Sequence, residues 1–170
     1  MKRIALLLAL VPFAAQAAKP ACVEPHDMRV LLRMALPDAI EGLAARCKAV
    51  LPSDAFLPTE GAGLAERFRR EAPVDPARAR KAVEAATGQD LSSFADDATV
   101  LGIAHNFVEA AIEQRVATRD CDAIDAMVSL AAPLRADAMS EALLIALEAA
   151  KPGQIKGLAI CGPSAESAPR

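Results

Sequence analysis

The sequence predicts an all-α fold, a compact single-domain bundle of about six or seven short helices that two disulfides cross-link. Apolar residues recur at helical spacing along the chain, and no segment alternates apolar and polar residues between turn signals as a strand would. Proline and glycine stand at positions where helices begin and end. Hydrophobic residues make up 54% of the chain, which is enough to fill the core of one domain.

The first 17 residues have the pattern of a secretory signal peptide. Two basic residues precede an apolar stretch that contains Pro12, and Ala15-Gln16-Ala17 matches a small-x-small cleavage site. This stretch is shorter than the about twenty residues of a membrane span. We therefore expect a mature chain that starts at Ala18, exported to the bacterial periplasm or secreted, with residues 18–170 forming one helical domain that does not span the membrane.

Cys22 follows the leader closely, as the acylated cysteine of a bacterial lipoprotein does. Lys19 and Pro20 precede it, whereas a lipobox has small or aliphatic residues there. We therefore do not expect a lipid anchor.

The first half of the mature chain predicts four helices. Asp27 opens a helix over about 27–35, Pro37 interrupts it, and a second helix carries apolar residues on one face through position 51. A third helix covers 63–72 and ends at Pro73. The fourth covers 77–87, because Asp75-Pro76 is an N-cap followed by proline and Thr87-Gly88 is a stop.

The second half predicts the longest helix, from 96 to about 116, with the carboxylates of Asp96 and Asp97 at its positive end. A helix around 121–128 follows, Pro133 breaks it, and another helix runs over 137–150. We expect a short extended piece near 155–160 and a frayed tail from about 163. The expected buried residues of the longest helix are Val100, Ala104, Phe107, Val108, Ala111 and Ile112.

The helix expected over 137–150 is apolar almost all round. Leu144 and Ile145 interrupt the polar strip that Glu141 and Glu148 would otherwise form. Such a helix is either the buried centre of a domain or a helix with one face covered by a partner.

The four cysteines, Cys22, Cys47, Cys121 and Cys161, all lie after the leader. An even number of cysteines in an exported chain favours disulfides, and no closely spaced pair suggests zinc or redox chemistry. We expect Cys22 to pair with Cys47 and Cys121 with Cys161, because the chain should turn back at Pro37 and again at Pro133.

Composition excludes several classes of ligand. Without the leader, 17 basic residues face 22 acidic ones, a net charge of about −5 that argues against a nucleic-acid partner. The chain has no Trp or Tyr, so carbohydrates and nucleotides, which usually stack on aromatic rings, are not expected ligands. A basic stretch over 67–81 is interleaved with acidic residues and favours a solvated helix face over a binding patch.

Motifs for catalysis or cofactor binding are missing from the sequence: it has no G-x-S-x-G, S-x-x-K, H-E-x-x-H or P-loop pattern, and we expect no cofactor. His105, Glu109 and Glu113 are spaced at four residues and could seat a metal on one helix face, but a solvated His–Glu contact is the ordinary outcome of that spacing. His26 beside Asp27 suggests a capping or exposed role.

These observations give three functional hypotheses. The first is a non-catalytic exported protein that binds another macromolecule, expected to be a protein of the cell envelope. The second is a carrier of an apolar small molecule in a cavity lined by Phe107, Ile112, Leu143, Leu144 and Leu147. The third is a metal-assisted hydrolase that uses His105, Glu109 and Glu113.

Overall fold

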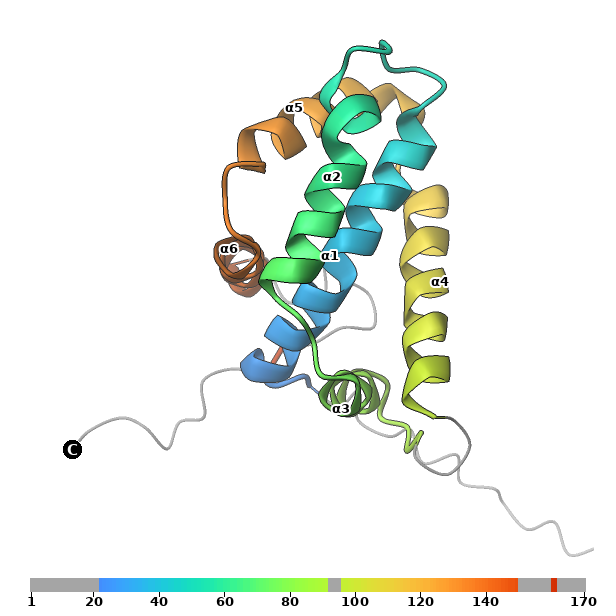
Figure 1. Ribbon diagram of the computed structural model, residues 1–170. Helices are drawn as coiled ribbons and strands as arrows, with labels where there is room; N and C mark the ends of the chain where they lie inside the picture. Colours follow the sequence, from blue (N-terminus) through green and yellow to red (C-terminus); the bar gives the residue numbers. More distant parts are fainter. Residues whose placement is uncertain (1–21, 92–95, 150–159, 162–170) are drawn as a thin grey trace, which may run out of the picture.

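One long helix, α1 (Pro25–Cys47), is the element against which most of the other helices pack (Figure 1). The computed structural model describes residues 22–91, 96–149 and 160–161. α2 (Phe56–Glu71) lies alongside α1, and α4 (Asp97–Arg115) and α6 (Ala136–Ala149) pack against α1 on opposite sides. α3 (Pro76–Thr87) contacts α1 and α4, while the short 3₁₀ turn η1 (Thr118–Asp120) leads into α5 (Cys121–Ala131), which packs on α2. The all-α prediction is confirmed.

α1 continues through Pro37, so the prediction of two separate helices was wrong. Pro37 has no N–H to donate to the carbonyl four residues earlier, a loss of about 3 kcal/mol in a helix interior. Pro37 and Ile40 are nevertheless buried, and Ile40 belongs to the core that α1 forms with α2. Burial of this face offsets the lost hydrogen bond, and α1, at 23 residues, exceeds the 19-residue α4 that was expected to be longest.

Local signals set the ends of α3 and α4 as predicted. Asp75 Oδ1 accepts a hydrogen bond from the N–H of Arg78 at 2.8 Å, and Gly88 ends α3 with φ 68°. Asp96 caps α4 by accepting from the N–H of Thr99 at 2.7 Å, and this contact holds the pKa of the Asp96 carboxyl below its ordinary value. Both caps satisfy N–H groups that have no partner inside the helix.

α2 begins seven residues before the predicted position because a distant residue caps it. Asp125 of α5 accepts hydrogen bonds from the N–H groups of Phe56 at 3.2 Å and Leu57 at 2.6 Å. No side chain near Phe56 in the sequence performs this role. Contact between α2 and α5 therefore determines where α2 starts.

The core has two parts. The larger part lies between α1, α2 and α5, and the smaller one joins the N-terminal end of α1 to α6. The larger cluster includes Ile40, Cys47, Leu57, Leu64, Ala65, Phe68 and Cys121, and the smaller one Val23, Met28 and Leu144.

The disulfides join Cys47 to Cys121 and Cys22 to Cys161, so both predicted pairings were wrong. The physical reason is the continuity of α1. A helix of 23 residues rises about 35 Å, so Cys22 and Cys47 lie at opposite ends of it and cannot bond. Cys47 instead meets the start of α5, and all four cysteines are in disulfides as expected.

The second disulfide ties the two ends of the described chain together. Val23 and Ile160 form an isolated parallel bridge, and the N–H of Cys161 donates to the carbonyl of Val23 at 3.0 Å. Ile160 is the one described residue of the extended piece expected near 155–160. The predicted signal peptide, its cleavage site, and the tail from about 163 lie outside the described residues. Across the ranges that the structure covers, none of the helices has the length and apolar character that a membrane crossing requires.

Candidate functional site

The outward surface of α5 carries a continuous apolar stripe. Ala123, Ala126, Met127 and Leu130 are all exposed, and their i, i+3, i+4, i+7 spacing places them on one side of the helix. Exposure reaches 63% for Met127 and 82% for Leu130. We call these four residues the α5 apolar face. A contiguous exposed apolar patch of this kind is typical of a protein-binding surface.

α5 is fixed rigidly to the rest of the fold. The disulfide to Cys47 holds its first residue, Cys121, which is 1% exposed. One turn later Asp125 accepts the two N–H groups of α2 described above. Ile124 and Val128 pack against the larger core. The inward side of α5 therefore supplies anchors along its length, and the outward side is held in one orientation.

The loop after α5 is also held in place. The guanidinium of Arg67 on α2 donates to the carbonyls of Ala132 and Leu134, and it lies 5.2 Å from the centre of the Phe68 ring. Glu71 accepts a hydrogen bond from the N–H of Ala136 at 2.9 Å. These contacts fix Leu134, which is 43% exposed, close to the C-terminal end of the α5 apolar face.

The sequence did not single out the α5 apolar face. Apolar spacing along the sequence predicts one stripe that contains Met127 together with Cys121, Ile124 and Val128. In the structure Met127 is exposed, while the other three face inward. A short helix that is apolar on two sides gives no periodic signal for which side is buried.

Part of the predicted buried stripe of α4 is also exposed. Val100 is 2% exposed as predicted, but Phe107 is 72% exposed. Ile103, which was not part of the predicted stripe, is 60% exposed. α4 packs on α1 and α3 at the edge of the bundle (Figure 1). A helix at an edge buries a narrower face than one between two layers, so the predicted stripe was too wide.

The pair Leu144–Ile145 on α6 splits between the two alternatives left open. Leu144 is 1% exposed and lies in the smaller core with Met28, whereas Ile145 is 58% exposed. α6 is thus buried on the side that meets α1 and open on the other.

Two of the side chains expected to line a carrier cavity, Phe107 and Leu144, lie on helices that α1 separates. Leu144 is buried on α6, Phe107 extends into solvent from α4, and α1 lies between these helices (Figure 1). Ile112 of α4 instead packs on α1 at Gly42, where its Cδ1 lies 2.8 Å from the position that a Cβ would take. Phe107 and Leu144 thus belong to helices on different sides of α1.

His105 lies in a network of ion pairs that connects α1, α2 and α4. Its Nδ1 is 3.1 Å from Asp38 Oδ2 and its Nε2 is 3.6 Å from Glu109 Oε1, so the expected His–Glu contact forms. Asp38 also accepts a hydrogen bond from Arg69 at 3.1 Å. Glu113 is exposed and outside this network. Among the described side chains, no three His, Cys, Asp or Glu residues are arranged to hold a metal ion.

Arg69 is the centre of this network. It donates to Glu41 at 2.7 Å as well as to Asp38. The hydrogen bond from Arg69 is the main reason that the pKa of Glu41 lies below its ordinary value, and the same contact raises the pKa of Arg69. With each acid paired to a cation or to His105, this network fits a structural link between helices.

No protein family model matches the chain, and neither the curated proteins nor the solved structures contain a match to it.

Proposed function

We propose that this chain is a non-catalytic, exported protein that binds a partner protein of the cell envelope through the α5 apolar face. The observation that carries the proposal is the presence of four exposed apolar residues at i, i+3, i+4, i+7 spacing on a helix that a disulfide holds in place. This spacing is the one by which an amphipathic helix fits into an apolar groove of another protein.

The energetics favour Met127 and Leu130 as the two anchors. Burying one such side chain contributes roughly 1.5–3 kcal/mol, while the alanines at 123 and 126 permit close approach of a partner backbone. Because α5 is already fixed by Cys121 and Asp125, little conformational entropy is lost on binding. Methionine at the centre of the face adapts readily to the shape of a groove.

Export is supported by the two disulfides together with the leader pattern in the first 17 residues. Disulfides form and persist in oxidising compartments such as the bacterial periplasm. Asp122 is exposed at the start of the face, and the mature chain is acidic. A groove with a basic rim in the partner would complement this charge.

The proposal is tested by capture with matched variants. Met127→Ser/Leu130→Ser removes both anchors, and Ile103→Ser/Phe107→Ser removes two residues of similar exposure from α4 as the control. In quantitative pull-downs from native periplasm, one protein should be retained by the wild type and by the α4 variant and lost with the α5 variant. The amount of this protein that the α5 variant retains should be lower by at least about tenfold.

A photo-crosslinker placed at position 126 identifies direct contact. We expect it to label the same protein that the pull-down recovers. Absence of any reproducible partner, or equal loss with both variants, would rule out the α5 apolar face as the binding surface.

A further inference from the structure

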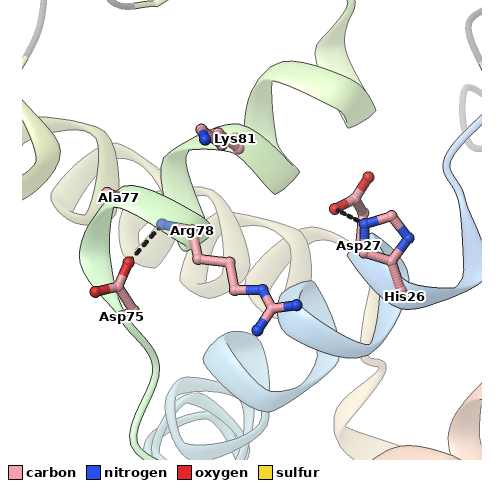
Figure 2. Close-up of a pocket in the computed structure, with 6 residues that line it drawn as sticks. All are labelled: His26, Asp27, Asp75, Ala77, Arg78 and Lys81. Atoms are coloured by element: carbon pink, nitrogen blue, oxygen red, sulfur yellow. Dashed lines mark hydrogen bonds and ion pairs between the residues drawn. The ribbon is translucent and has the colours of Figure 1, made fainter.

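A cleft lies between the first turn of α1 and the first two turns of α3 (Figure 2). Its volume is about 330 Å³, and its lining consists of His26, Asp27, Asp75, Ala77, Arg78 and Lys81. This volume is at the lower end of the range for small-molecule sites, roughly 300–1,000 Å³. The cleft is therefore large enough for a small ligand, and its lining is charged.

The two acids of the cleft are already engaged by the protein. Asp27 Oδ1 lies 3.0 Å from His26 Nε2. Asp75 is occupied as the N-cap of α3, where it accepts the N–H of Arg78 at 2.8 Å. Both contacts are visible in Figure 2. Each carboxylate of the lining thus has a partner within the chain.

The two permanent cations of the cleft are not engaged in this way. The side chains of Arg78 and Lys81 have no acidic or carbonyl partner among the described residues. Their neighbour Arg80, on another side of α3, lies 2.7 Å from Asp97. Arg67 and Arg69 of α2 are likewise paired or hydrogen-bonded. Arg78 and Lys81, which have no such partner, are therefore the basic residues of α3 that line the cleft.

Arg78 and Lys81 both line this cleft from α3. Arg78 and Lys81 are three residues apart on α3, so they lie on one side of the helix. In Figure 2 the guanidinium of Arg78 extends from α3 toward the ribbon of α1. The opposite wall is the first turn of α1, which none of the described side chains caps. The positive end of that helix adds to the positive potential.

We propose that this cleft binds a small dianion, of the class of phosphate monoesters and dicarboxylates, through Arg78 and Lys81. Arginine binds either kind of group with two parallel hydrogen bonds, and lysine adds a second positive charge. His26 at the α1 side offers a third polar contact. The site is separate from the α5 apolar face, so it stands or falls independently of the proposed partner.

The test is an NMR titration of the ¹⁵N-labelled mature chain, with its disulfides intact, against inorganic phosphate and, separately, succinate. We expect saturable shifts of the amide signals of residues 24, 26–29, 75 and 77–82, with dissociation constants of about 1 mM or below. Stronger binding of phosphate would assign the phosphate monoesters, and stronger binding of succinate the dicarboxylates. Sodium chloride at matched ionic strength controls for screening.

Arg78→Gln and Lys81→Gln should each weaken binding by about tenfold, because each removes one charge-assisted contact. Lys48→Gln/Arg135→Gln is the matched control, since both residues are exposed cations remote from the cleft lining. It should change the dissociation constant less than about twofold. Shifts that do not saturate by about 10 mM, that sodium chloride reproduces, or that the control variant weakens equally would overturn the proposal.

Discussion

Replacing Cys47 and Cys121 together by alanine is expected to lower the free energy of unfolding by about 4–5 kcal/mol. The bond joins residues 74 apart, inside a ring that Cys22–Cys161 closes over a separation of 139. It therefore divides that ring into arcs of 74 and 65 residues, which is equivalent to closing a loop of about 35 residues and contributes about 4 kcal/mol in the loop-entropy model. Loss of two buried sulfur atoms adds a packing cost on the order of 1 kcal/mol.

Urea unfolding followed by far-UV circular dichroism measures this loss. The free energy of unfolding should also fall more steeply with urea concentration, because the unfolded chain without the bond exposes more surface. A loss of less than about 2 kcal/mol, with an unchanged dependence on urea concentration, would refute the loop-entropy argument for Cys47–Cys121.

Thiol titration of the same variant under denaturing conditions tests the pairing itself. Cys22–Cys161 remains closed in the Cys47→Ala/Cys121→Ala variant, so no free thiol should be found. A pairing of Cys22 with Cys47 and of Cys121 with Cys161 would leave two free thiols. The two pairings therefore give different counts.

Four further substitutions test other features of the fold. Asp125→Ala should lower the free energy of unfolding by about 1–2 kcal/mol in urea titrations, because it removes the cap of α2. Gly102→Ala should raise it by about 0.5–1 kcal/mol, since this exposed helical position has open space for a Cβ, whereas Gly88→Ala should lower it by about 1 kcal/mol because φ is 68°. Glu41→Gln should reduce the loss of stability in acid: Arg69 lowers the pKa of Glu41 from 4.5, so its contribution is present above pH 4.5 and disappears as the pH falls through the lowered pKa.

Matched variants make these results specific. Asp122→Ala changes an exposed acid on the same helix as Asp125 and should alter the free energy of unfolding by less than about 0.5 kcal/mol. Glu60→Gln, at an exposed position of α2, should retain the wild-type acid dependence. Equal effects of the two aspartate variants would contradict the capping role of Asp125. A destabilising Gly102→Ala would contradict the open space at that position. A wild-type acid profile in Glu41→Gln would contradict the contribution of the Glu41–Arg69 contact.

Sequence reasoning succeeded where the signal is local. The ends of α3 follow from Asp75-Pro76 and Thr87-Gly88, because a cap and a left-handed glycine act on backbone groups within one turn. The start of α2 could not be predicted in this way. Its cap, Asp125, lies 68 residues beyond Leu57 in the chain. The contact therefore depends on the packing of α5 on α2.

Pro37 shows how tertiary packing overrides a local rule. The rule that proline interrupts a helix considers only the lost hydrogen bond and the local clash. It leaves out the free energy gained by burying the apolar face, which continues before and after Pro37. This one error led to the wrong disulfide pairing, because a chain that turned back at Pro37 would have brought Cys47 to Cys22. The expectation that Phe107 and Leu144 line one cavity has a different origin. Helical periodicity shows which side of a helix is apolar, but it does not show which helices lie next to each other.

The same continuity of α1 accounts for the candidate binding surface. Because α1 is unbroken, Cys47 lies far from Cys22 and bonds to the first residue of α5, which places α5 at the C-terminal end of α1. There α5 packs on α2 with one side, and its position at the edge of the bundle leaves the other side open (Figure 1). A helix with apolar residues on both sides, buried on one and fixed by a disulfide, presents the second side in a single orientation. The disulfide therefore stabilises the fold and orients Met127 and Leu130 for the proposed partner.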